Sequence, residues 1–409
     1  MRDRLQCARM KRNTLLIIAV AVAGLFLFVN PLQYLRRGGA ARPAVDKAEV
    51  SALLAYAEGN WRSPEDYVLS TFTGHDIVFL GEFFKIRQNV QLVSGLVPRL
   101  YAAGVRNLGI EYALSDDQKE IDALVSAPSW DESRARAITF NWLVTWGYQE
   151  YIDLYKAAWQ VNHGLPAGAT PFRVVGLNVR QHWENLKSEK DMNDPKVVAR
   201  IFSEGIPDAH MADVIDREFV QKGVKALVYC GTQHIFTRYR SSEYEKNAAE
   251  MKLSETRRTG NLVYAKIGAR AFCVSLHAPW PDRAQRSRLA YPAAGALDAL
   301  IAALPAEKKS GGWNTAGNPL GALPVTSSDY AIGATGLTLS GLFDGYVVQG
   351  PISEYTTVTA IPDFVRPEDA ERASQGFPGV KSTPLTREQV NQTIADDVQA
   401  MGKMLTAFK

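Results

Sequence analysis

The chain has 409 residues, of which 46% are hydrophobic and 22% charged, the composition of a globular protein with a sizeable core. Its formal net charge of +3 is too small for a general nucleic-acid-binding surface, so we expect no nucleic-acid partner. The three cysteines contain no CxxC pair, which argues against both a disulfide framework and a cysteine zinc site.

The first 43 residues differ from the rest of the chain. Residues 14–29 form an uncharged apolar run, which follows a basic cluster and precedes Arg36 and Arg37. This pattern predicts an uncleaved inner-membrane anchor whose basic end is cytoplasmic, with the main domain extracytoplasmic, in the periplasm. The alternative is a secretory signal that is cleaved, after which the protein is secreted.

Strand-like and helix-like segments alternate after a linker that ends at Pro43. The strand-like segments are 76–82, 106–113, 172–178, 225–234, 270–277 and 343–350. The helix-like segments are 85–103, 116–125, 135–161, 195–204, 211–221 and 243–258. Short apolar strands separated by helices predict an α/β fold with a mostly parallel sheet flanked by helices on both faces.

The end of the chain has a different pattern. Residues 305–340 are rich in Gly, Pro, Ser, Thr and Asn, which predicts a long loop excursion on the surface. Thr386 and Gln389 predict a capping box, and apolar residues recur after them at helical spacing. We therefore predict a main domain over residues 44–365, followed at 366–409 by a loop and an amphipathic helix that packs on it.

Polar side chains close five of the predicted strands. They are Glu82, Glu111, Asn178, the pair Gln233 and His234, and His277. Parallel strands bring such groups to one carboxyl edge, where ligands bind in open α/β folds. Carboxylates beside a histidine can perform general acid–base chemistry or bind a divalent metal.

We therefore predict catalytic roles for Glu82, Glu111 and His234, which are also the candidate ligands of zinc or manganese. The predicted ligand-binding residues are Asn178, Gln233 and His277. The aromatic residues between Trp142 and Trp159 have largely helical spacing, which predicts a core face, with the wall of an apolar ligand pocket as the alternative.

Three motifs resemble the superfamily that joins erythromycin esterase-like proteins, ChaN-like haem-binding proteins and the Tiki/TraB proteins. They are FLGEFF at 79–84, LGIEYA at 108–113 and YCGTQHIF at 229–236, within a resemblance that covers residues 44–362. The resemblance implies that Glu82, Glu111 and His234 form the polar site, with Asn178 beside it. The family pattern has a histidine two residues after the first glutamate, where this chain has Phe84.

Two function classes follow from this resemblance. One is a metal- or His-assisted hydrolase of esters, lactones or amides, favoured because Glu82, Glu111 and His234 are all present. The other is a non-catalytic protein that binds haem or another apolar small molecule, favoured by Phe84, which can neither ligate a metal nor accept a proton. The candidate axial haem ligands are Tyr229, Tyr239, His234 and His277.

Overall fold

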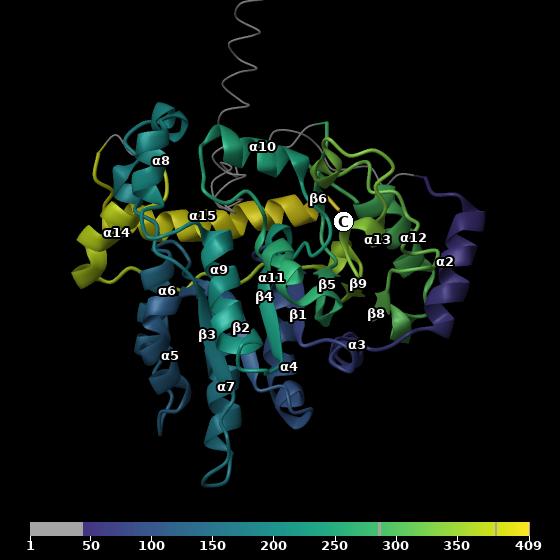
Figure 1. Cartoon of the computed structure of the whole chain (residues 1–409), viewed down its shortest axis with the longest axis horizontal. Coiled ribbons are helices and arrows are strands. Elements are labelled where there is room, and N and C mark those ends of the chain that lie inside the picture. The colour runs from purple at the N-terminus through teal and green to yellow at the C-terminus, as the bar shows by residue number, and fades with distance from the viewer. Residues whose placement is uncertain (1–43, 285–287, 381–382, 409) are drawn as a thin grey trace, which may run out of the picture.

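The computed structural model describes residues 44–284, 288–380 and 383–408 (Figure 1). The predicted membrane segment, within residues 1–43, lies outside the described residues. Among the described helices, none is both long enough and apolar enough to cross a lipid bilayer.

The described chain is organised around a seven-stranded sheet with the strand order β3-β2-β4-β1-β5-β9-β8 (Figure 1). The strands are β1 Ile77–Glu82, β2 Asn107–Leu114, β3 Arg173–Asn178, β4 Ala226–Gly231, β5 Ala271–Leu276, β8 Gly311–Asn314 and β9 Gly345–Val348. All neighbours pair in parallel except β8, which runs antiparallel to β9. The predicted mostly parallel α/β fold is confirmed. A separate two-stranded ribbon pairs β6 Trp280–Pro281 with β7 Leu289–Ala290.

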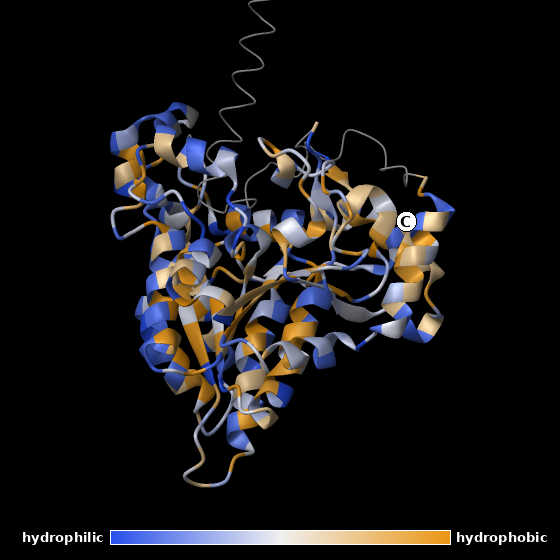
Figure 2. Ribbon diagram, turned by 45° about the vertical axis from the view of Figure 1, so that its right-hand side comes forward, coloured by the Kyte–Doolittle hydropathy of each residue, from blue (hydrophilic) through white to orange (hydrophobic). Residues whose placement is uncertain are grey.

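Side chains of β1 alternate between two cores, because successive residues of a strand point to opposite faces. Val78 and Leu80 lie in one apolar cluster, and Ile77 and Phe79 lie in the other. Figure 2 shows hydrophobic residues along the strands and on the helix surfaces that face them. The first cluster includes residues of α3 Pro64–Thr71, α4 Arg87–Ala102, α5 Gln118–Val125, α6 Glu132–Trp142 and α7 Gln149–His163. The second includes residues of α2 Lys47–Gly59, α9 Pro207–Ile215, α11 Thr259–Ile267, α12 Ala296–Ala303 and α13 Leu339–Leu342.

The predicted helix over residues 135–161 is wrong, because the chain breaks into α6 and α7 there. Leu143 and Tyr148 are extended, and Tyr148 pairs with Ala360 in an isolated bridge. A Cβ on Gly147 would lie 2.4 Å from Phe364, so the chain passes too close for a larger residue. Contacts with a distant segment therefore override the local helical pattern.

Three further predicted helices have different bounds in the structure. The helix expected at 211–221 is α9, which begins at Pro207 and continues as a π-helical stretch over Asp216–Val220. The segment expected to be helical at 243–258 forms α10 Ser242–Glu250, and α11 begins only at Thr259. The helix expected at 195–204 is α8 Pro195–Ile201. These shifts matter because Asp208 and Arg258 then lie at the beginnings of α9 and α11.

Residues 305–340 are more deeply buried than predicted. They supply the edge strand β8, and Leu320, Val325 and Tyr330 are buried in the second core. The surface character expected for this excursion is therefore wrong for these side chains, since a loop rich in Gly and Pro still carries enough apolar residues to pack.

The C-terminal helix α15 Arg387–Thr406 crosses the molecule above the sheet, next to α14 Ala370–Gly376 (Figure 1). The predicted capping box of Thr386 and Gln389 is confirmed. One face of α15 is buried, and Asp397 forms an ion pair of 2.6 Å with Lys85, which follows β1. The helix is thus anchored beside the carboxyl end of the central strands.

Candidate active site

The two predicted catalytic glutamates lie at the carboxyl edge of the sheet but on opposite faces. β4 separates β1 from β2, so Glu82 and Glu111 flank the same strand. Glu82 continues the face of Val78 and Leu80, whereas Glu111 lies on the face opposite to Ile110. The prediction that all the polar groups gather in one cluster therefore holds only for a part of them.

Glu111 and His234 do come together. After β4 the chain turns through a short 3-10 helix, Thr232–His234, which brings the His234 Nε2 atom to 3.5 Å from the Glu111 Oε1 atom. The other oxygen of Glu111 accepts a hydrogen bond of 2.8 Å from the backbone N–H of Gly231. On its opposite side, the His234 Nδ1 atom lies 2.7 Å from an oxygen of Asp208. His234 is thus held between two buried carboxylates.

Asp208, which the sequence did not single out, is the most heavily bonded residue of the site. Besides His234, it accepts hydrogen bonds from the backbone N–H and the hydroxyl of Thr259 at 2.8 and 2.9 Å. The Arg258 guanidinium binds its second oxygen at 3.0 Å, and the Tyr244 hydroxyl donates to the same oxygen at 3.2 Å. The only signal in the sequence is Pro207, which marks the first turn of a helix.

These contacts set the ionisation of the three groups. Burial alone raises the pKa of Asp208, but the neighbouring His234 and Arg258 charges outweigh it and hold that pKa well below its usual range. Burial lowers the pKa of His234, yet the Asp208 and Glu111 carboxylates more than offset this and raise it overall. Burial raises the pKa of Glu111. Asp208 is therefore ionised and favours the protonated form of His234, whose Nε2 atom has no hydrogen-bond partner among the described residues.

Glu82 has different surroundings on the other face of the sheet. One carboxylate oxygen accepts hydrogen bonds from the hydroxyls of Tyr112 and Tyr151, the latter at 2.8 Å, and Tyr151 in turn accepts one of 3.0 Å from the backbone N–H of Lys85. The other oxygen has no hydrogen-bond partner among the described residues. Burial raises the pKa of Glu82 to about 8, although the Tyr112 hydrogen bond opposes the shift. Glu82 is therefore largely protonated at neutral pH.

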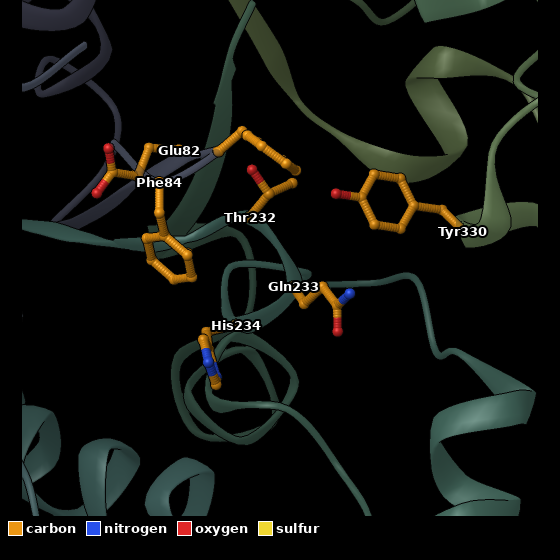
Figure 3. Close-up of a pocket in the computed structure, with 8 residues that line it drawn as sticks. Glu82, Phe84, Thr232, Gln233, His234 and Tyr330 are labelled. Carbon is orange, nitrogen blue, oxygen red and sulfur yellow. The ribbon is translucent and has the colours of Figure 1, made fainter. Parts of the chain in front are cut away.

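Phe84 lies between these two groups. In Figure 3 its ring is placed between Glu82, whose carboxylate points away, and His234. The ring also packs edge-on against Trp146 and Tyr112, with ring centres 5.5 and 6.0 Å apart. The residue that replaces the expected histidine therefore separates the Glu82 side from the His234 side.

A small pocket opens in front of His234. Its volume of about 20 Å³ is sufficient for a water molecule. It is lined by Glu82, Phe83, Phe84, Gly231, Thr232, Gln233, His234 and Tyr330 (Figure 3). His234 is thus the member of the buried Asp208–His234–Glu111 group that reaches this pocket.

We predict that Gly231→Ala destabilises the protein through Phe84. A Cβ on Gly231 would lie 2.5 Å from the tip of the Phe84 ring, so the ring must move, at a cost of about 1–3 kcal/mol in the free energy of unfolding. Phe84→Ala should remove most of that cost. Urea unfolding of the two single variants and the double variant measures the coupling, and additive effects would contradict this contact.

The three predicted ligand-binding residues have separate positions. Gln233 lines the pocket and accepts a hydrogen bond of 2.6 Å from Arg258. Asn178 bonds to the backbone of Glu111 and Val179, and so closes the end of its strand without lining the pocket. His277 forms a distinct buried pair with Asp298 at 3.4 Å, and its Nδ1 atom lies 3.0 Å from the Tyr346 hydroxyl. Of the three, only Gln233 lines this pocket, and its role in binding a ligand stays a prediction.

The predicted metal ligands Glu82, Glu111 and His234 are not arranged as a metal site. Within the described ranges, no group of three or more His, Cys, Asp or Glu side chains could hold a metal ion. The reason is that Glu82 faces its tyrosines, while both ring nitrogens of His234 face carboxylates.

Haem does not fit the pocket in front of His234 either. About 20 Å³ is far below the several hundred Å³ that sites for larger ligands enclose. Of the candidate axial ligands, His234 alone lines this pocket, whereas Tyr229, Tyr239 and His277 are buried elsewhere in the described structure. The described residues thus provide neither the space nor a second ligand for haem there.

Comparison with known proteins identifies the fold. No family model and no curated protein sequence matches the chain. A solved structure of a protein from Bacillus cereus is similar, with 12% sequence identity and a TM-score of 0.50 over 76% of this chain and 99% of that one. An erythromycin esterase mutant in its open conformation matches with 12% identity and a TM-score of 0.46, over 73% of this chain and 98% of that one. ChaN of Campylobacter jejuni, solved with cofacial haem, matches with 14% identity and a TM-score of 0.34, over 52% and 86%. At these identities the resemblance is one of fold alone, and at that level the predicted resemblance is confirmed.

Proposed function

We propose that this protein is a His-assisted hydrolase of an ester, lactone or amide, with His234 as the catalytic residue. The observation that carries this proposal is the position of His234 between Asp208 and Glu111, at the wall of a pocket that accommodates water. A histidine with one nitrogen fixed by a carboxylate and the other directed toward a second acid is suited to proton transfer.

The reaction that this geometry supports consumes one water molecule. The pocket holds the attacking water, and the substrate carbonyl meets it at the opening of the pocket. Water attacks the carbonyl carbon, and the bond to the leaving oxygen or nitrogen breaks. His234 donates the proton on its Nε2 atom to the leaving group, and the proton of the attacking water replaces it there. Asp208 accepts the hydrogen bond from Nδ1 throughout, so the ring keeps its orientation and its charged form is stabilised.

Turnover of a series of aryl esters, lactones and anilides by the full-length protein tests this proposal. His234→Ala should reduce kcat/KM by at least about 100-fold, in line with the loss of a general acid–base group. His163→Ala is the matched control, because this histidine is exposed at the end of α7 and lies outside the pocket. Equal rates in wild type and His234→Ala would exclude His234 as the catalyst, and no turnover of any substrate by the folded protein would favour the non-catalytic alternative.

We further propose that residues 14–29 anchor the protein in the inner membrane, with the main domain in the periplasm. The uncharged run behind a basic cluster supports this orientation. Protease added to spheroplasts should degrade the main domain of an anchored protein. A main domain that resists protease until the cells are lysed would contradict the periplasmic placement, and release into the medium would support signal cleavage.

A further inference from the structure

A second, larger pocket lies beside β3, between α6, the loop after β3 and α14. Its volume is about 280 Å³, close to the lower end of the range for small-molecule sites. Figure 1 shows α6 and α14 on the side of the sheet where β3 forms the edge. The residues that line it are Phe140, Asn141, Trp142, Val144, Arg180, Gln181, His182, Trp183, Glu184, Arg372, Gln375 and Gly376.

The charged side chains of this pocket favour an anion. Arg180, in the loop after β3, is exposed and forms no ion pair within the described residues. The second lining arginine, Arg372, belongs to α14. Arg372 donates a hydrogen bond of 2.6 Å to Asn141 and lies 3.4 Å from Asp369. The one lining carboxylate, Glu184, is bound to His182 at 2.8 Å. Arg180 is therefore the lining arginine without a carboxylate partner among the described residues, and the lining glutamate is already paired with His182.

Acidic groups outside the lining are also engaged. Asp117 accepts hydrogen bonds of 3.1 and 3.3 Å from Asn141. Burial raises the pKa of Asp117, and the Asn141 hydrogen bond and the Arg180 charge oppose that shift. Glu204 lies 2.6 Å from His182, and Asp369 also pairs with Arg366. Because these carboxylates already have partners, Arg180 keeps donors for a ligand, and guanidinium groups bind carboxylate and phosphate through paired hydrogen bonds.

The inner wall of the pocket is aromatic. Trp142 is half-buried, and its indole ring packs on Tyr112 and Trp146 with ring centres 5.5 and 5.0 Å away. The ring is thus held by the same tyrosine that binds Glu82, which makes it a rigid surface against which a flat group can stack.

We propose that this pocket binds a small anionic ligand with a flat ring, whose carboxylate or phosphate contacts Arg180 and Arg372 while the ring lies on Trp142. This site is separate from the pocket of His234, so its occupation does not depend on the hydrolase activity proposed above.

Calorimetric titration of the full-length protein with benzoate, phenyl phosphate, inorganic phosphate and benzyl alcohol tests this site. We expect saturable binding of at least one aromatic anion, tenfold or more weaker binding of inorganic phosphate, and no binding of benzyl alcohol. Preference for benzoate or for phenyl phosphate identifies the acidic group. Arg180→Gln should weaken binding about tenfold or more, since it removes one charge-assisted contact from an exposed side chain.

The controls separate this site from general charge effects. Arg270→Gln, at the amino end of β5, removes an exposed arginine elsewhere and should leave the affinity unchanged. Trp142→Leu should weaken the binding of the aromatic anions and leave the binding of inorganic phosphate unchanged. The proposal is overturned if neither aromatic anion binds, if the Arg180→Gln/Arg372→Gln double variant binds them as wild type does, or if benzyl alcohol binds equally well.

Discussion

Asp208→Ala is expected to lower the free energy of unfolding by about 3–5 kcal/mol, the range for removing one partner of a buried ion pair. The substitution leaves the buried Arg258 guanidinium and the His234 ring without their shared carboxylate. It also removes the acceptor of the Thr259 N–H at the first turn of α11. Urea unfolding monitored by circular dichroism measures the change.

Two further variants separate charge from shape. Asp208→Asn keeps an oxygen for the Thr259 N–H but loses the negative charge. It should therefore lower the free energy of unfolding, but by less than Asp208→Ala does. Asp213→Ala, on the same helix, removes an exposed carboxylate and should change stability by less than about 0.5 kcal/mol. A cost for Asp208→Ala as small as that of Asp213→Ala would show that the buried network does not support the fold.

Glu82→Gln is expected to stabilise the protein at alkaline pH. The pKa of Glu82 is raised by burial from an ordinary value of 4.5 to about 8, so the folded state keeps a proton that the unfolded state has lost. Between these two pH values the unfolded state is favoured progressively, and wild-type stability falls as pH rises. At about 1.36 kcal/mol for each pKa unit, the penalty above pH 8 is on the order of 5 kcal/mol.

Glutamine keeps an oxygen for the Tyr112 and Tyr151 hydroxyls but has no proton to lose. The variant and the wild type should therefore differ little at pH 4.5 and increasingly up to pH 8, with the variant more stable. Glu58→Gln, an exposed position in α2, is the matched control and should follow the wild-type profile. Parallel stability profiles for Glu82→Gln and wild type between pH 4.5 and 8 would show that Glu82 is not buried as a neutral acid.

Local sequence pattern was sufficient for the six parallel strands and for the edge at which the site lies, but not for the antiparallel edge strand β8. Short apolar runs ending on polar residues predict parallel strands. Glu82 ends β1 and His234 follows β4 as expected, whereas Glu111 lies three residues before the end of β2, directly after its last pairing with β4. The capping box of α15 was equally readable, because Thr386 and Gln389 are three residues apart and need only each other.

Tertiary structure decided how those groups are paired. Whether the side chains of two separate strands share a face depends on strand order and register, and these place Glu82 and Glu111 on opposite faces of the sheet. His234 and Asp208 are 26 residues apart, and Asp208 and Arg258 are 50 apart, so no local period reports either contact. The break between α6 and α7 has the same cause, since it is set by packing against Phe364. Sequence by itself determined which chemical groups reach the edge, whereas packing between distant segments determined which of them touch.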